Sequence, residues 1–186
     1  MTERKVSANS LKNLTQFNLE NRSLTRESIE TALLFFMETK QLSQITISEL
    51  VKKAGVSRNA FYRNYHSKED ILEGMLKQTV RRVGRGLKQF DLKTQTYQAW
   101  LYLLKEARKE AHVLALIFKN HCEELLNRVV TKRITAYQRY KQKHVITYSN
   151  AFWSSGIISI LRNWVADNMR ISEEDLAALN LPLLPF

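Results

Sequence analysis

Residues 57–64 gather the side chain types that contact bases and phosphates in nucleic acid complexes. An arginine guanidinium can make a bidentate contact with the O6 and N7 atoms of guanine, an asparagine amide can pair with adenine, and an alanine can touch a thymine methyl group. A tyrosine hydroxyl suits a phosphate oxygen. The cluster offers all four types, as Arg58, Asn59, Ala60, Tyr62, Arg63 and Asn64. This chemistry predicts contacts with DNA.

Two short helices joined by a glycine turn are predicted to position this cluster. Thr46 and Glu49 have capping-box spacing, which gives the first helix a defined start. Gly55 lets the chain leave that helix with a positive φ, and Ser57 is placed to cap the second helix. The arrangement predicts a helix-turn-helix whose second helix enters the major groove of DNA.

The neighbouring residues supply the supports of this motif. Phe61 and Tyr65 lie four residues apart and are expected to anchor the second helix from behind. A helix from about residue 26 to residue 40 is expected to pack across the back of the motif. Ser67 is placed to cap a further helix, and Lys68 near its start adds a positive charge for a phosphate.

The composition agrees with a basic helical protein that binds a polyanion. Five glycines and two prolines in 186 residues favour long helices over a β-rich fold. The formal net charge is +11; residues 1–90 contain 16 Lys+Arg against 9 Asp+Glu, and residues 91–186 contain 13 against 9. The more basic half therefore contains the helix-turn-helix, which favours nucleic acid over a membrane surface.

The chain is expected to be cytoplasmic. One cysteine, Cys122, allows no intrachain disulfide. The N-terminal residues lack an apolar core of signal-peptide length. The most apolar stretch, residues 145–161, is interrupted by polar residues and falls short of the roughly 20 apolar residues that a bilayer span needs. No membrane partner is therefore predicted.

The run AGVSRNAFYRNYHSKEDILEGML resembles the recognition-helix signature of TetR-type bacterial transcriptional regulators. The resemblance is specific over about residues 25–76; Tyr65 stands where phenylalanine is usual. It implies DNA contacts from the turn, the recognition helix, the threonine before the preceding helix and the lysine after it. The predicted DNA-binding set is Thr46, Ser57, Arg58, Asn59, Ala60, Tyr62, Arg63, Asn64 and Lys68.

The predicted fold is all-α, with a three-helix DNA-binding domain followed by a larger helical domain for ligand binding and dimerisation. Residues 1–23 are expected to form a flexible basic arm, with minor-groove or phosphate contacts or local packing as alternatives. Residues 24–70 form the helix-turn-helix domain, and residues 71–186 form the regulatory and dimerisation domain.

The second domain offers candidate residues for two further sites. Aromatic and histidine side chains are candidates for an effector cavity, although aromatic side chains at helical spacing are more often core; they are Trp100, His112, Phe118, His121, Tyr148 and Phe152. Small residues in an apolar helix would admit a second helix, either in a dimer interface or in ordinary intradomain packing. The dimer candidates are Phe152, Ser155, Gly156 and Ser159.

Catalytic, cofactor and metal sites are not predicted. The chain has no Walker loop, no G-x-G-x-x-G, no H-E-x-x-H and no G-x-S-x-G motif. The adjacent His121 and Cys122 point about 100° apart on a helix and have no partner at metal-ligand spacing. We therefore expect neither an enzyme nor a bound cofactor or metal.

These observations predict a regulator of transcription. A two-fold homodimer would bind a palindromic operator in double-stranded DNA, because one short recognition helix reads only a few base pairs. The resemblance implies a repressor that a small-molecule effector releases by shifting the helix that begins near Ser67. Three alternatives stay open: an activator of the same architecture, a non-specific architectural DNA-binding protein, and a ligand carrier with a vestigial DNA-binding unit.

Overall fold

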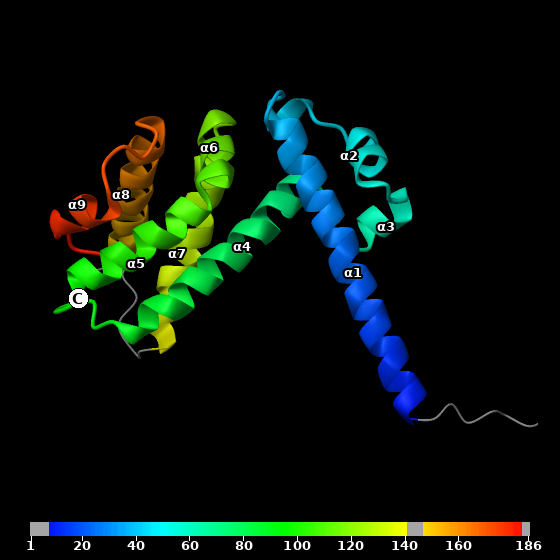
Figure 1. The fold of residues 1–186 in the computed structure, drawn as a ribbon, viewed down its shortest axis with the longest axis horizontal. Helices are drawn as coiled ribbons and strands as arrows, with labels where there is room; N and C mark the ends of the chain where they lie inside the picture. The colour runs from blue at the N-terminus through cyan, green and yellow to red at the C-terminus, as the bar shows by residue number, and fades with distance from the viewer. Residues whose placement is uncertain (1–7, 141–146, 184–186) are drawn as a thin grey trace, which may run out of the picture. The chain divides into compact units, whose positions relative to one another are not determined.

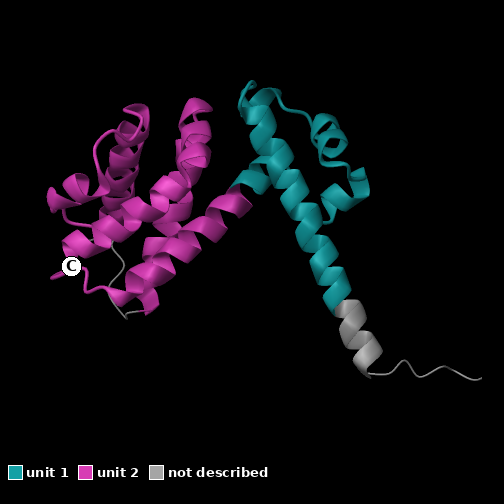
Figure 2. Cartoon of the chain, in the orientation of Figure 1, with its two compact units in different colours: residues 1–72 teal, residues 73–186 magenta. Residues whose placement is uncertain are grey.

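A computed structural model of the chain describes residues 8–140 and 147–183, and the regular structure of these residues is entirely helical. The predicted all-α class is confirmed. Two compact units comprise residues 1–72 and 73–186 (Figure 2). Helix α4 contains the boundary between them, because its residues 68–72 belong to unit 1 and its remainder belongs to unit 2.

Unit 1 consists of a long first helix with two short helices beside it (Figure 1). Its elements are α1 (Ala8–Met37), the 3₁₀ turn η1 (Leu42–Gln44), α2 (Ile47–Ala54), α3 (Arg58–Tyr62) and the start of α4 (Lys68–Gly86). Helix α1 begins well before the expected start near residue 26, so residues 8–23 are helical where a flexible arm was predicted. Residues 8–37 contain neither glycine nor proline, which removes the usual helix breakers. Residues 1–7 of the predicted arm lie outside the described residues.

The core of unit 1 lies between α1 and the helix-turn-helix. Helix α1 contributes an apolar stripe, and the short helices contribute Leu50 and Phe61, both fully buried. The stripe of α1 consists of Ile29, Ala32, Leu33 and Met37. Their spacing of three and four residues places them on one helical face. This burial fixes α2 and α3 against a rigid support.

Unit 2 is a helical bundle that includes the remainder of α4 (Figure 1). Its other elements are η2 (Leu87–Gln89), α5 (Thr96–Lys109), α6 (Ala111–Lys119), α7 (Glu123–Tyr140), α8 (Thr147–Ala166) and α9 (Glu173–Ala178). Helix α7 packs along α8, and α5 packs against α9. The buried Trp100 side chain on α5 donates a 2.5 Å hydrogen bond from Nε1 to the Leu181 carbonyl, which holds the C-terminal segment to the bundle.

Helices α7 and α8 meet along a polar seam. The Ser154 hydroxyl is 2.7 Å from the Thr131 hydroxyl, and Asn150 Nδ2 donates to Gln138 Oε1 at 2.8 Å. Ser154 and Asn150 are fully buried. The small residue Ser154 therefore serves packing within unit 2.

Candidate nucleic-acid interface

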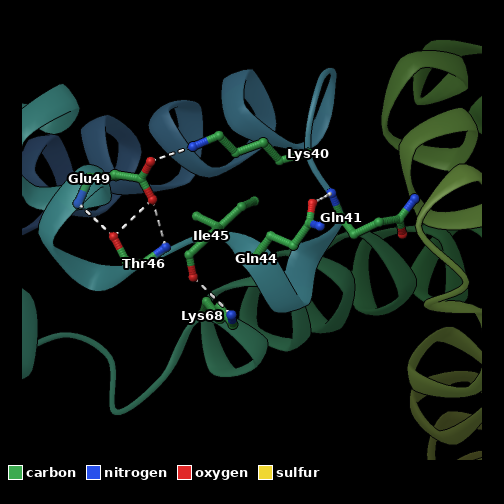
Figure 3. Close-up of polar contacts among 7 residues, drawn as sticks. All are labelled: Lys40, Gln41, Gln44, Ile45, Thr46, Glu49 and Lys68. Carbon is green, nitrogen blue, oxygen red and sulfur yellow. Dashed lines mark hydrogen bonds and ion pairs between the residues drawn. The ribbon is translucent and has the colours of Figure 1, made fainter.

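Helix α2 begins with the capping box that the sequence predicts (Figure 3). The Glu49 N–H donates to Thr46 Oγ1 at 3.2 Å, and the Thr46 N–H donates to Glu49 Oε2 at 3.0 Å. The Thr46 hydroxyl also donates to Glu49 Oε2 at 2.8 Å. Two backbone N–H groups at the helix start are thus satisfied by side chains.

Glu49 also forms an ion pair that the capping pattern does not predict. Lys40, which follows α1, donates from Nζ to Glu49 Oε1. This hydrogen bond, supported by the Thr46 backbone N–H, lowers the pKa of Glu49 to about 2 from an ordinary 4.5. The cap is therefore ionised at neutral pH and joins the start of α2 to the end of α1.

The turn between α2 and α3 has the geometry expected of a glycine. Gly55 adopts φ 66° and ψ 27°, a left-handed conformation that disfavours side chains with a Cβ. Ser57 then caps α3, because its Oγ accepts a 3.1 Å hydrogen bond from the Ala60 N–H. The predictions for Gly55 and for the capping role of Ser57 are confirmed.

Two aromatic side chains anchor α3 from the interior. Phe61 is fully buried and Tyr65 nearly so, with their ring centroids 6.4 Å apart. The Tyr65 hydroxyl donates to Glu30 Oε1, and the Arg26 guanidinium lies 4.8 Å from the centroid of the Tyr65 ring. Burial and the Glu30 carboxylate both raise the pKa of Tyr65, so the hydroxyl stays protonated as a donor.

The opposite side of α3 presents to solvent several residues that the sequence predicts to contact DNA bases. Four of them are exposed: Arg58, Asn59, Tyr62 and Arg63. Helix α3 is only five residues long, so Arg63 is its C-cap and Asn64 lies beyond the helix. Ala60 and Asn64 are half-buried. The exposed side is therefore cationic, amide-bearing and aromatic, which suits base edges and phosphates.

Two of the residues predicted to contact DNA bases are held by contacts within the protein. Arg58 Nη2 donates to Ser48 Oγ on α2 at 2.6 Å. Asn64 Oδ1 accepts from Arg22 Nε at 3.3 Å, and Asn64 Nδ2 donates to the Ala60 carbonyl at 2.8 Å. Arg58 is thereby oriented along α2, whereas the amide of Asn64 is occupied by Arg22 of α1 and by the Ala60 carbonyl of α3.

The ammonium group of Lys68, which the sequence predicts to contact a phosphate, binds backbone carbonyls within the protein. Its Nζ donates to the Ser43 carbonyl at 2.7 Å. It also donates to the Ile45 carbonyl at 2.8 Å, the bond drawn in Figure 3. An ammonium group has three donors, so these bonds leave one for another acceptor. Lys68 therefore joins the start of α4 to the segment that precedes α2.

Sequence reasoning did not identify Arg22 and Ser48 as supports of this surface. Arg22 lies 42 residues from Asn64, and no local pattern relates the two positions. Ser48 was within reach of the sequence argument, because it sits in the first turn of α2, the helix that crosses next to the recognition helix in this motif.

Unit 2 contains an apolar cavity of about 170 Å³. An apolar cavity of about 150 Å³ is large enough to hold benzene. Its walls come from α4 to α8, with Leu183 of the C-terminal segment. The wall residues are mostly aliphatic and include Leu76, Val80, Val83, Leu103, Val113, Leu114, Leu126, Val130, Ile134 and Ile157. Two glutamates, Glu106 and Glu110, also line it.

The residues predicted to form an effector cavity lie elsewhere: none of the six is among the residues that line this cavity. Trp100 is buried in the core of unit 2, and Phe118 lies half-buried with the Arg162 guanidinium 5.8 Å from its ring centroid. The other four side chains are exposed, namely His112, His121, Tyr148 and Phe152. Aromatic character indicated ligand contact, whereas the cavity wall is aliphatic.

The residues predicted for a dimer interface share one exposed face of α8. Phe152, Ser155, Gly156 and Ser159 are all exposed. Tyr148, one turn before Phe152, is 90% exposed, and Phe152 is 69% exposed. Their spacing of three and four residues forms a stripe along the helix.

Within residues 8–140 and 147–183, no group of three His, Cys, Asp or Glu side chains is arranged to hold a metal ion. In the same part of the chain, no helix has both the length and the apolar character to cross a membrane.

Comparison with solved structures supports the fold. Lin0861 from Listeria innocua superposes with a TM-score of 0.74 over 84% of this chain and 87% of that chain, at 20% identity. The fatty acid degradation regulator FadR from Bacillus halodurans gives a TM-score of 0.52 over 86% and 92% of the two chains, at 18% identity. At these identities the likeness concerns the fold.

Sequence comparison concerns the helix-turn-helix more directly. The HTH-type transcriptional regulator YxbF from Bacillus subtilis (strain 168) is 30% identical over 97 residues, which cover 52% of this chain. The match spans about a quarter of that relative's length, 24%. Residues 37–75, which include α2, the turn and α3, match the model of the bacterial regulatory proteins of the tetR family. Over residues 37–75, the chain is therefore similar to the DNA-binding part of this family.

Proposed function

We propose that this protein is a homodimeric, sequence-specific regulator of transcription, most simply a repressor that a small-molecule effector releases from a palindromic operator. The observation that carries the proposal is the construction of α3. Buried Phe61 and Tyr65 fix the helix, while exposed Arg58, Tyr62 and Arg63 face outward. A rigid helix with donors on its outer side suits insertion into the major groove. Bacterial chromosomal DNA would place the protein in the cytoplasm.

The exposed face of α8 supports the homodimer. Tyr148 and Phe152 expose large rings next to the small residues Ser155 and Gly156, which would let a second helix approach closely. A second copy would cover the exposed rings. Two copies would present recognition helices to half-sites about 34–36 Å apart.

The cavity in unit 2 supports control by an effector. Helix α4 supplies Leu76, Val80 and Val83 to its wall and also contains residues 68–72 of unit 1. An occupant that prefers one position of α4 would shift the population of DNA-competent dimers by its difference in affinity for the two states. An activator would use the same architecture at another operator position.

The proposal is tested by selecting genomic DNA fragments with the purified protein at physiological salt. A regulator of this kind is expected to recover one or a few palindromic sites, bound typically 10³–10⁷ times more tightly than random DNA. Recovery of fragments without a shared motif, with the same salt dependence for every sequence, would identify a non-specific architectural protein instead.

Two variants test the parts of the proposal separately. Arg63→Ala should reduce the ratio of operator to random-DNA affinity by roughly 10- to 100-fold, because it removes a base contact. Lys105→Ala is the control, since Lys105 is an exposed cation of unit 2.

For the dimer, Phe152→Arg should give monomers in analytical ultracentrifugation, and Leu179→Arg, also at an exposed apolar position, should not. A dimeric Phe152→Arg protein would exclude this face of α8 as the interface.

A further inference from the structure

The cavity of unit 2 is apolar except at one edge. Thr79, Glu106 and Glu110 are the polar side chains among its lining residues, and none of the lining residues described is basic or aromatic. The side chain of Glu106 is 8% exposed, and that of Glu110 is 27% exposed. Two carboxylates therefore border a pocket whose other walls are mostly hydrocarbon.

Two cations neutralise these carboxylates from outside the lining. Arg82 on α4 pairs through Nη1 with Glu106 Oε2 and through Nη2 with Glu110 Oε1, the latter at 2.6 Å. Lys109 Nζ donates to Glu106 Oε1 at 2.5 Å. The side chains of Arg82 and Lys109 are 42% and 66% exposed, so water screens them more than it screens Glu106. The two carboxylates line the cavity, whereas Arg82 and Lys109 do not, so the cavity lies closer to the negative groups than to the positive ones.

The glutamate most deeply buried at this edge remains ionised. The hydrogen bond from Lys109 lowers the pKa of Glu106, aided by the charge of Arg82 and opposed by desolvation. A carboxylate can accept about four hydrogen bonds. From described residues, Glu106 accepts one from Arg82 and one from Lys109, and Glu110 accepts one from Arg82. Both carboxylates keep acceptor capacity for a ligand.

We propose that the cavity binds an aliphatic amine, with its hydrocarbon part between the walls of α4 to α8 and its ammonium group on Glu106 and Glu110. An aliphatic body suits these walls because no lining aromatic ring offers a stacking surface. An ammonium group is favoured over a carboxylate because the charged atoms nearest the cavity are negative. The binding itself stands independently, but its regulatory role rests on the proposed function.

The same geometry gives the amine a route to α4. Arg82 of α4 pairs with the carboxylate of Glu106 on α5 and with that of Glu110, which directly precedes α6. The ammonium group of the ligand competes with Arg82 for these two carboxylates. Weakening these pairs releases α4 from this part of the bundle. The effector would therefore act by replacing a side chain cation with a ligand cation.

Calorimetry with three ligands of equal chain length tests the ligand class. Octylamine and octan-1-ol share an eight-carbon hydrocarbon body, octanoate has one methylene fewer, and the three ligands differ in the head group. At neutral pH, octylamine should bind at least about tenfold more tightly than octanol, because its ammonium donor is ionised as well as the carboxylate acceptors, whereas the octanol hydroxyl is neutral. Octanoate should bind most weakly. Equal or tighter binding of octanoate, or no binding of any of the three, would overturn the proposal.

Substitution of the glutamates locates the site. Glu110→Gln should lower octylamine affinity about tenfold or more and leave octanol affinity unchanged. Glu174→Gln is the matched control, because Glu174 pairs with Lys105 away from the cavity. Glu106→Gln should act in the same direction; since Glu106 is buried, its unfolding curve must be checked first. Octylamine affinity that is unchanged in folded Glu110→Gln protein would refute this site.

The regulatory step is tested on a selected DNA fragment. Octylamine should weaken DNA binding by the native protein, and Glu110→Gln should need about tenfold more octylamine or more for the same effect, a control that also excludes direct action of the amine on DNA. Glutamate-dependent octylamine binding without any change in DNA affinity would uphold the ligand class and refute effector control. If no specific DNA is selected, the proposed function fails, while calorimetry still decides the ligand class.

Discussion

The helix starts of unit 1 and the cavity edge of unit 2 depend on contacts of different range in sequence. In unit 1, each start of α2, α3 and α4 is capped by a serine or threonine three residues before its partner N–H. In unit 2, the polar contacts that define the cavity edge join residues 24 and 28 positions apart, and Trp100 bonds a carbonyl 81 positions away. Local rules thus build the DNA-binding motif, whereas the cavity depends on tertiary packing.

Two leucine-to-alanine substitutions, one in each unit, should show the largest difference in unfolding free energy. Leu50 on α2 is fully buried in a filled core, whereas Leu114 lines the cavity and already faces empty space. Leu50→Ala should cost about 4 kcal/mol of unfolding free energy and Leu114→Ala about 2, because truncation costs 2–5 kcal/mol and more where contacts on all sides are lost. Urea unfolding followed by circular dichroism measures both. Equal costs would show that the cavity is filled in solution.

Two glycine substitutions test how tightly the bundle of unit 2 constrains α4. A Cβ on Gly86 would lie 1.9 Å from the Tyr102 hydroxyl oxygen, whereas a Cβ on Gly156 would meet no atom within 4 Å. Gly86→Ala should destabilise the protein by about 1–3 kcal/mol through overpacking. Gly156→Ala should stabilise a monomer by about 0.5–1 kcal/mol, the helix preference for alanine.

The double variant Gly86→Ala, Tyr102→Ala isolates the cause. It should recover much of the stability that Gly86→Ala alone loses relative to Tyr102→Ala, because the colliding ring is absent. If Gly86→Ala is as stable as the native protein in thermal unfolding, α4 can move away from α5 without cost. In that case, the contact between these helices would not be a tight one.

The contrast in range explains what the sequence could predict. Thr46, Gly55 and Ser57 follow rules that act within four residues, and the structure confirms the conformation or the cap at each of them. The all-α class followed from glycine and proline content and from apolar periodicity. The early start of α1 was missed, because polar residues without apolar periodicity can still continue a helix when no breaker intervenes.

The cavity was not predictable by the same means. Its walls draw residues from five helices, and the apolar residues of each helix alone read as ordinary core. Glu106 is a charged residue in the middle of α5, and its burial depends on Arg82 and Lys109. The exposed positions of Tyr148 and Phe152 likewise cannot be distinguished from core by spacing. Assembly of the bundle decides all three outcomes.

The cap of α2 gives a prediction of intermediate size. Thr46→Ala should destabilise unit 1 by about 1 kcal/mol, the usual cost of losing an N-cap. Glu49 adds a pH dependence. Because its folded-state pKa of about 2 lies below the ordinary 4.5, its contribution is present above pH 4.5 and is lost as the pH falls toward 2. Glu49→Gln should remove this part of the acid transition, and an identical acid transition would refute the assignment.

Orientation of Arg58 by Ser48 should give the smallest effect. Ser48→Ala removes the 2.6 Å hydrogen bond to Nη2 and leaves the core intact, so stability should change by less than about 0.5 kcal/mol. Operator affinity should fall only about two- to tenfold, since a neutral acceptor contributes roughly 0.5–1.5 kcal/mol. Ser43→Ala, at another exposed serine of unit 1, should leave the affinity unchanged. In an Arg58→Ala background the Ser48→Ala effect should vanish, because Ser48 then has no guanidinium to orient. A persistent effect in that background would mean that Ser48 contacts the DNA itself.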